Sequence, residues 1–379
     1  MIDHRQIYST RALKTYVLNA RKGALHGLCT LFHTARKAVR TYAIPLAAPL
    51  LAGLPSSSFA AGMPEQTLRI SGYRDYLEFS HPVSMGLAKF SEILSANNHG
   101  QLQLEIRSPR PGSRPAQQIS ALRRTTLQKG DPQIMLQATT GLVDLVDEFG
   151  LLDLPFVIRN ERQADALLDG PFGAKLLATL PEQGLVGLAY WENGFRHMTS
   201  SKAPITSADD FKGLKMRVIP SPMFTQPFET IGAQTLAMPF ASLYQALATK
   251  TVNAQDNYYS QIVAGKLHQV QGYLSETHHS YSALIVLINK GVWDQLTPTE
   301  QRILRDAAIE AGNYQRHLNR QANRAARVRL KSLGMMINTV PAAELNRLQS
   351  LTEPVTERLT RDYDPSIKKL FEDELRKAD

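Results

Sequence analysis

Residues Gly213–Tyr258 read GLKMRVIPSPMFTQPFETIGAQTLAMPFASLYQALATKTVNAQDNY and alternate between strand-like and helix-like patterns. The run Lys215–Ile219 predicts a strand and Pro222–Ile231 a helix, and Gln234–Ala237 with Phe240–Thr249 repeats this pair. Such an alternation is typical of α/β folds.

Arg217 stands in the middle of the first of these strands, among apolar residues. An unpaired guanidinium that is buried costs several kcal/mol or more, so a strand that contains one usually supplies an anion. No acidic residue lies beside Arg217 in the sequence, which leaves a distant side chain or a bound carboxylate as its partner.

The α/β pattern extends outward from this stretch in both directions. The apolar run Ala283–Asn289 predicts a strand at the centre of a sheet that is covered on both faces. Further strands are expected at Thr67–Ser71, Leu102–Arg107, Gln133–Gln137 and Leu185–Tyr190, and helices at Ser84–Ala96, Gln117–Lys129 and Gln163–Leu180, the last interrupted at Gly170–Pro171.

A long helix is predicted near the carboxyl end. Thr297 is an N-cap, Pro298 suits the first turn, and Glu300 completes a capping box. Helix-compatible residues then continue to Leu333, and Gly334 suits the carboxyl-terminal cap. At about 1.5 Å per residue the helix is roughly 54 Å long, which indicates a helix that spans two domains. A coiled-coil arm is the alternative.

The basic charge of the chain is concentrated in its first 60 residues. The chain of 379 residues has a formal charge of +9, and residues 1–60 contain eight basic side chains against Asp3 alone. The remainder is nearly balanced, so it has no electrostatic signature of nucleic-acid binding.

These first 60 residues have the order of an export signal. The basic segment precedes the apolar run Ala43–Leu54, and the small residues Ser56–Ala60 offer a cleavage site after Ala60. The run is shorter than the roughly 20 residues that span a bilayer. A basic arm followed by a buried strand is the alternative. Cys29, the only cysteine, lies in this segment, so the mature chain is expected in the periplasm without thiol chemistry.

The common catalytic and phosphate-binding signatures are absent from the sequence. His278 and His279 are adjacent but lack nearby ligands at metal spacing, which favours a structural role. We therefore expect no enzyme activity, no catalytic residues, no cofactor and no metal.

Four spaced motifs, in order, resemble the substrate-binding proteins of tripartite ATP-independent periplasmic (TRAP) transporters. The similarity spans about residues 80–340. The motifs are Asn193–Arg196 (NGFR), Gly213–Val218 (GLKMRV), Met238–Thr249 (MPFASLYQALAT) and Val252–Tyr258 (VNAQDNY).

The resemblance implies an α/β, two-domain fold like that of periplasmic binding proteins, with a central cleft and a long helix that bridges both domains. Domain I would comprise 62–192 plus 283–322, and domain II 193–282 plus 323–379, after a leader of residues 1–60.

The resemblance also implies roles for five residues. Arg217 would form a two-pronged salt bridge with a ligand carboxylate, a geometry that suits guanidinium. Arg196 would add a second charged contact, and Asn257 would donate its amide to the same carboxylate. Phe240 and Trp191 would line the pocket, with core packing as the alternative for both.

The implied function is capture of a small organic acid by domain closure and its delivery to the permease subunits of a TRAP transporter. A monomer is expected, with a dimer as the alternative. A sensor that docks on a membrane receptor and an enzyme on the same fold are the alternative functions. The motif VNAQDNY and the first-domain loop Pro111–Gln118 (PGSRPAQQ), followed by Arg123–Arg124, depart from the family pattern. The sequence therefore predicts the carboxylate-binding end of the site and not the identity of the ligand.

Overall fold

The computed structural model of the chain describes residues 66–72, 81–99, 101–109 and 114–378. The predicted leader and its cleavage site lie outside these residues. Residues Gly62–Asp379 form one compact unit. Among the described residues, no helix is both long enough and apolar enough to cross a membrane.

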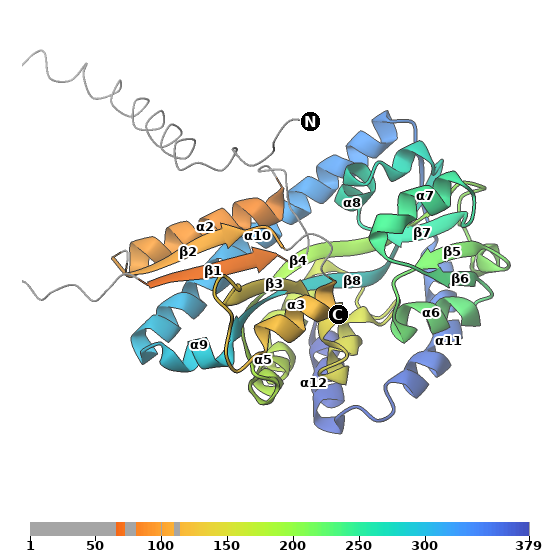
Figure 1. The fold of residues 1–379 in the computed structure, drawn as a ribbon. Coiled ribbons are helices and arrows are strands. Elements are labelled where there is room, and N and C mark those ends of the chain that lie inside the picture. Colours follow the sequence, from red (N-terminus) through yellow and green to blue (C-terminus); the bar gives the residue numbers. More distant parts are fainter. Residues whose placement is uncertain (1–65, 73–80, 100, 110–113, 379) are drawn as a thin grey trace, which may run out of the picture. The chain divides into compact units, whose positions relative to one another are not determined.

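A single mixed sheet of nine strands organises the described residues (Figure 1). The strands follow the order β2-β1-β3-β8-β4-β7-β5-β6, and β9 pairs with β8. Their bounds are β1 Gln66–Gly72, β2 Leu102–Arg107, β3 Ile134–Ala138, β4 Leu185–Ser200, β5 Lys215–Val218, β6 Gln234–Ala237, β7 Ala254–Asn257, β8 Tyr273–Asn289 and β9 Met336–Thr339.

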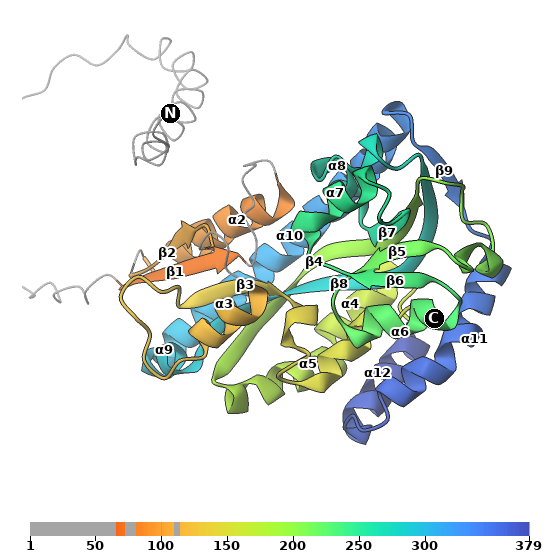
Figure 2. The ribbon, with the colours of Figure 1, turned by 45° about the vertical axis from the view of Figure 1, so that its right-hand side comes forward.

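Helices cover both faces of this sheet (Figure 2). The α-helices are α2 Pro82–Asn97, α3 Pro115–Leu122, α4 Glu161–Asp169, α5 Pro171–Thr179, α6 Pro222–Thr230, α7 Leu243–Ala248, α8 Tyr259–Ala264, α9 Lys290–Gln295, α10 Pro298–Ser332, α11 Ala342–Leu359 and α12 Pro365–Lys377. The 3₁₀ helices are η1 Thr139–Leu142, η2 Asp147–Asp153, η3 Leu180–Gln183, η4 Ala208–Phe211, η5 Phe240–Ser242 and η6 Leu267–Gln269.

Two long strands, β4 and β8, run antiparallel through the middle of the sheet. The sequence predicts only the apolar ends of these strands, at Leu185–Tyr190 and Ala283–Asn289. Both strands continue through polar residues, because the polar segments pair with each other, and irregularities near Gly187, Gly194 and His197 shift the register. Polar residues inside a strand are compatible with the ladder when backbone groups are satisfied.

The buried apolar side chains form three clusters. The largest includes side chains of η2, α4, α5, α6 and α12, together with one face of the sheet. A second cluster joins α2 and the first half of α10 to the strands β1, β3, β4 and β8. The third lies among α7, α8, the end of α10 and the adjacent part of β8.

Helix α10 connects the second and third of these clusters. Its capping box forms as predicted, since Thr297 accepts from the backbone N–H of Glu300 at 3.3 Å and Glu300 accepts from the Thr297 N–H at 2.8 Å. Leu304 is buried in the second cluster and Leu330 in the third. The predicted bridging helix is therefore confirmed.

The two last helices pack against different parts of the chain. Helix α11 packs on α6, whereas α12 packs on α4, α5 and η2. The rings of Phe371 in α12 and Phe172 in α5 lie 5.1 Å apart. The link between α11 and α12 thus returns the chain to the elements that precede β4.

Candidate functional site

The ladder of β4 and β8 is flanked by other strands at its two ends and not at its middle. Strand β3 ends at Ala138, which pairs with Leu284, and Leu284 also pairs with Trp191. Strand β7 ends at Asn257, which pairs with His197. The distance from Trp191 to His197 is about 20 Å at roughly 3.3 Å per residue. We call residues 192–196 and 280–283 the central ladder.

The carboxyl ends of two sets of parallel strands meet at the central ladder. Strands β1 and β3 are parallel and run toward it from one side, and β5 and β7 are parallel and run toward it from the other. Ligands of open α/β sheets bind at the carboxyl ends of the strands. The segments that follow β3, β5, β6 and β7 are therefore the candidate ligand-binding segments.

Arg217 lies at one of these carboxyl ends, in β5, and is 3 % exposed. Its Nε and one terminal nitrogen both donate to the carbonyl oxygen of Met238, at 3.0 and 2.8 Å. Met238 immediately follows β6, the neighbour of β5. The Met238 carbonyl thus binds one edge of the Arg217 guanidinium group. These two hydrogen bonds fix the plane of the guanidinium group and the direction of its remaining N–H groups.

Asn257 and Phe240 lie on the segments next to Arg217. Asn257 ends β7, is 3 % exposed and donates its amide to Oε1 of Gln255 at 3.2 Å. Phe240 begins η5 and packs against the third apolar cluster. The structure thus brings Arg217, Asn257 and Phe240 to the ends of three adjacent strands, β5, β7 and β6.

Arg196 and Arg217 lie on opposite faces of the sheet. Met216 and Ala254 pair between β5 and β7, and both belong to the largest apolar cluster. Arg217 follows Met216 and so faces away from that cluster, because successive side chains of a strand alternate. Asp256 lies two residues after Ala254 and shares its face, and Arg196 is bonded to Asp256.

Arg196 forms a buried ion pair. Its Nε donates to Oδ2 of Asp256 at 2.5 Å, and a terminal nitrogen donates to the Asp256 carbonyl at 2.6 Å. The side chain of His279 also meets Oδ2 of Asp256, at 3.2 Å. Burial alone would raise the pKa of Asp256, yet Arg196 and His279 hold it well below its ordinary value. The contacts observed for Arg196 are therefore those of a structural pair.

Trp191 is part of the core. Its side chain is 0 % exposed, its indole donates to the carbonyl of Ala308 in α10 at 3.1 Å, and its ring meets Phe90 edge to face. A side chain without exposed surface offers no contact to a solute in this arrangement, so we leave Trp191 out of the proposed site.

The sequence reasoning did not identify Asp153, which ends η2 and is 1 % exposed. Its Oδ1 accepts from Thr140 at 2.9 Å. Burial raises the pKa of this carboxyl to about 7, although Thr140 and the charge of Arg196 lower it. The signal available in the sequence was a lone acidic residue within the apolar run Leu151–Phe156.

A pocket of about 240 Å³ lies against the central ladder and α10. Its lining residues include Gly194, His197, His278 and Arg327 and none of the five predicted site residues. Arg327 is paired with Glu276. The pocket therefore lies apart from the segment that holds Arg217. Among the described residues, no cluster of His, Cys, Asp or Glu could hold a metal ion.

The family model of the bacterial extracellular solute-binding proteins, family 7, matches residues 75–362. This chain belongs to that family. The predicted resemblance to TRAP substrate-binding proteins and the predicted two-domain α/β fold are both confirmed. Members of the family are periplasmic binding proteins.

Curated relatives of this solute-binding protein bind small acids according to their names. The 2,3-diketo-L-gulonate-binding periplasmic protein of Escherichia coli is 37 % identical over 73 % of this chain and 80 % of its own length. The C4-dicarboxylate-binding periplasmic protein of Rhodobacter capsulatus is 30 % identical over 68 % of this chain and 78 % of its own.

Two solved structures of solute-binding proteins are also similar to this chain over most of its length. A TRAP periplasmic solute-binding protein from Ochrobactrum anthropi superposes with a TM-score of 0.77 at 33 % identity, covering 83 % of this chain and 96 % of its own. The sugar-acid-binding protein of Advenella mimigardefordensis, in complex with galactonate, gives 0.75 at 33 % identity, covering 84 % of this chain and all of its own.

Proposed function

We propose that this protein captures a sugar acid, a polyhydroxylated carboxylate, in the periplasm and delivers it to the permease subunits of a TRAP transporter. The observation that carries the proposal is the buried Arg217 at the carboxyl end of β5, with its guanidinium plane set by the Met238 carbonyl. Asn257 ends the neighbouring strand and supplies an amide for the same carboxylate. A guanidinium group matches a carboxylate with two parallel hydrogen bonds.

The class of acid is inferred from the relatives. The relatives named for 2,3-diketo-L-gulonate and galactonate are 37 % and 33 % identical to this chain, whereas those named for C4-dicarboxylates are 30 % and 31 % identical. 2,3-Diketo-L-gulonate and galactonate each carry one carboxylate. This is the group that we propose Arg217 and Asn257 bind, and we call these two residues the clamp. The preference for a sugar acid over a dicarboxylate rests on this difference.

Closure would occur about the central ladder, where β4, β8 and α10 connect the two proposed domains. The boundaries proposed from the sequence, 192/193 and 282/283, fall within it. We keep those boundaries and move α12 to domain I, because it packs on α4 and α5. Contacts made only in the closed state would then stabilise the bound form.

A binding role without catalysis is consistent with the buried polar groups. Thr277, His279 and Asp256 form a hydrogen-bonded chain, 2.7 Å from Thr277 to His279 and 3.2 Å from His279 to Asp256. All three side chains are nearly inaccessible, so the Thr277 hydroxyl is not available as a nucleophile. We also propose that residues 1–60 direct export and that the mature protein acts as a monomer.

A thermal-unfolding screen of residues 62–379 against galactonate, glucuronate and succinate tests the clamp. A solute at 100 times its dissociation constant adds about 2.7 kcal/mol to the free energy of unfolding. We expect galactonate to stabilise the wild-type protein and not the variant Arg217→Ala.

Arg123→Ala is the matched control, because Arg123 also donates to a backbone carbonyl, that of Gln183 at 2.7 Å, and lies away from the clamp. It should retain the response to galactonate. Equal stabilisation of all three proteins would disprove the role of Arg217, and a response to succinate alone would disprove the sugar-acid assignment.

A further inference from the structure

Asp153 has one carboxylate oxygen that is satisfied and one that is not. Oδ1 accepts the Thr140 hydroxyl at 2.9 Å, and Thr140 belongs to η1, directly after the carboxyl end of β3. Oδ2 is buried and has no hydrogen-bond partner among the described residues. An ionised carboxylate with an unsatisfied buried oxygen costs free energy, and a proton on that oxygen removes the charge.

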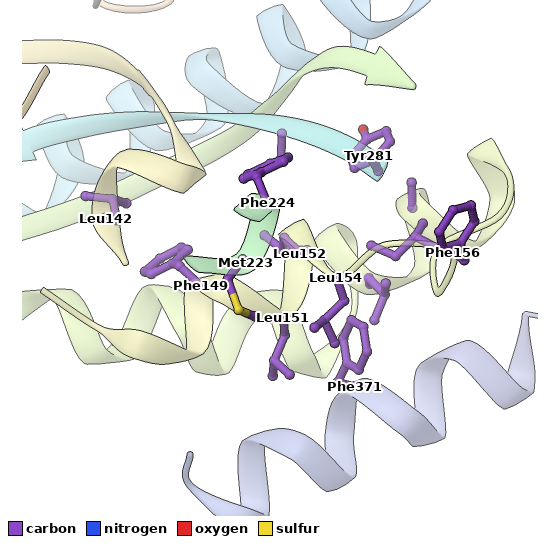
Figure 3. Close-up of a cluster of buried hydrophobic side chains, with 14 of the residues drawn as sticks. Leu142, Phe149, Leu151, Leu152, Leu154, Phe156, Met223, Phe224, Tyr281 and Phe371 are labelled. Atoms are coloured by element: carbon purple, nitrogen blue, oxygen red, sulfur yellow. The ribbon is translucent and has the colours of Figure 1, made fainter. Parts of the chain in front are cut away.

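The segment η2, which ends at Asp153, packs against α6. Figure 3 shows Met223 and Phe224 of α6 with Phe149 and Leu152 of η2, in one apolar cluster. A Cβ placed on Gly150 would lie 3.3 Å from Cε of Met223. In the division proposed above, α6 belongs to domain II and η2 to domain I, so closure would bring these apolar side chains over the segment that ends at Asp153.

Few charged groups face Asp153 from the elements packed around it. Arg196 of β4 lowers the pKa of Asp153 but is itself bonded to Asp256 of β7. On β8, the backbone carbonyl of His279 accepts from the N–H of Phe156, three residues after Asp153, at 2.5 Å. Tyr363, between α11 and α12, has a pKa raised to about 12, mainly by burial and partly by acidic groups that include Asp153.

Helix α6 contains no basic residue, and its one acidic residue, Glu229, is exposed. Arg196, the cation that acts on Asp153, is already paired with Asp256. Burial therefore dominates, and the pKa of Asp153 is about 7 in this arrangement against an ordinary value of 3.8.

We propose that Asp153 takes up one proton from solvent when the two halves close on the solute, so that capture of the acid is coupled to proton uptake. In the open state, separation of α6 from η2 would expose the carboxylate to water and let it ionise. Closure removes that water and leaves Oδ2 without a partner, and the proton converts the carboxylate to a neutral carboxyl group. The inference rests on the proposed function, because it requires closure on a ligand.

The coupling has a defined sign and size. A carboxyl group whose pKa rises on closure binds more protons in the closed state, so affinity increases as pH falls toward the open-state value. For a shift from about 4 to about 7, affinity rises roughly tenfold between pH 8 and pH 6, with about 0.9 proton taken up at pH 6. Galactonate stays ionised over this range, since carboxylic acids of its kind titrate near pH 3–4.

Two histidines just outside the central ladder, His197 of β4 and His278 of β8, have the opposite effect. His197 and His278 lie in contact, with ring centroids 4.4 Å apart, and burial lowers the pKa of both. If closure buries them further, they release protons and weaken binding at low pH. The proton balance of the whole protein therefore does not isolate Asp153, and the test compares variants.

Isothermal titration with galactonate at pH 8, 7 and 6, in buffers of different ionisation enthalpy, measures affinity and proton uptake together. The variant Asp153→Asn replaces the carboxyl by a neutral amide. We expect the wild-type affinity to gain about tenfold relative to this variant between pH 8 and pH 6. Asp131→Asn, a buried acid whose Oδ2 accepts from the Gln128 N–H at 3.0 Å, should behave as wild type.

Equal pH dependence of wild type and Asp153→Asn would overturn the inference while leaving the proposed function intact. Failure of galactonate to bind at every pH would count against the proposed ligand class instead. In that case, a ¹³C-carboxyl NMR titration of the unliganded protein decides, with Asp153→Asn for assignment. A midpoint near pH 4 supports the coupling, whereas a midpoint near pH 7 shows that Asp153 is protonated without closure on a ligand and overturns it.

Discussion

Arg196 donates to Asp256 twice, through Nε to the carboxylate at 2.5 Å and through a terminal nitrogen to the backbone carbonyl at 2.6 Å. Both side chains are at most 5 % exposed. The pair joins β4 to β7 beside the central ladder, and the ring of Phe224 in α6 lies 5.7 Å from the guanidinium carbon. The charge of Arg196 is thus neutralised within the half that also holds Arg217.

Arg196→Ala should destabilise the protein by about 3–5 kcal/mol, because it leaves the Asp256 carboxylate buried without its partner. The double variant Arg196→Met/Asp256→Leu removes both charges and should recover most of that loss. Urea unfolding at pH 7 measures both effects. If the single and double variants lose the same free energy, the pair is not the coupled unit described here.

Gly194→Ala should lower the free energy of unfolding by more than backbone strain at residue 194 alone would. Gly194 has φ +104°, and a Cβ there would lie 3.0 Å from Nδ2 of Asn323 in α10. A left-handed conformation costs a residue with a side chain roughly 1–2 kcal/mol. Gly130→Ala is the control, since Gly130 has φ +90° but open space around it. A larger loss of unfolding free energy at Gly194 is expected, and equal losses would show that α10 yields at this contact.

Glu276→Gln should reduce the dependence of stability on acid pH. Burial alone would raise the pKa of Glu276, but hydrogen bonds from Arg327, Tyr259 and Thr339 lower it to about 2, from an ordinary value of 4.5. A carboxyl group whose pKa is lower in the folded than in the unfolded state stabilises the protein at pH values above its unfolded-state pKa. That stabilisation is lost as pH falls toward 2. Urea unfolding between pH 5 and pH 2.5 should therefore show a steeper decline in the wild-type protein. Parallel curves for the two proteins would contradict the assigned pKa.

Phe371→Ala should destabilise the protein by about 3–5 kcal/mol, the usual loss for a buried phenylalanine. Phe371 is 4 % exposed and its ring packs on Phe172. Leu351→Ala in α11 is the control, because Leu351 is 43 % exposed and should change stability by less than about 0.5 kcal/mol. A small loss at Phe371 would show that α12 does not anchor on α5.

Local elements with strong periodicity were predictable from the sequence. Strands β2 and β6 have the predicted bounds, and α10 differs from its prediction only at its last residue. The break at Gly170–Pro171 also separates α4 from α5 as expected. Helix α3, however, ends at Leu122 rather than Lys129. The next two residues bond to other elements instead, since Arg123 donates to the carbonyl of Gln183 in η3 and the carbonyl of Arg124 accepts from Asn289 in β8.

The sequence predicted which residues would lie together better than it predicted how they pair. Arg217, Phe240 and Asn257 lie at the ends of three adjacent strands, and their contact with a ligand stays a prediction. The partner of Arg196 was not predicted, because the choice between a ligand and Asp256 depends on which sheet face each residue occupies. Asp153 was not predicted because its burial is a property of the tertiary packing around η2, which includes α6, an element distant in sequence.

The return of the chain through the link between α11 and α12 has a topological consequence. In the division that we propose, the chain passes from domain I to domain II through β4, returns through β8, crosses again along α10 and returns once more through that link. Because every outward passage has a return, the start of β1 and the end of α12 belong to the same half. A fluorophore or surface tether attached at either end would therefore hold that half, and the half that contains Arg217 would remain unencumbered as it moves.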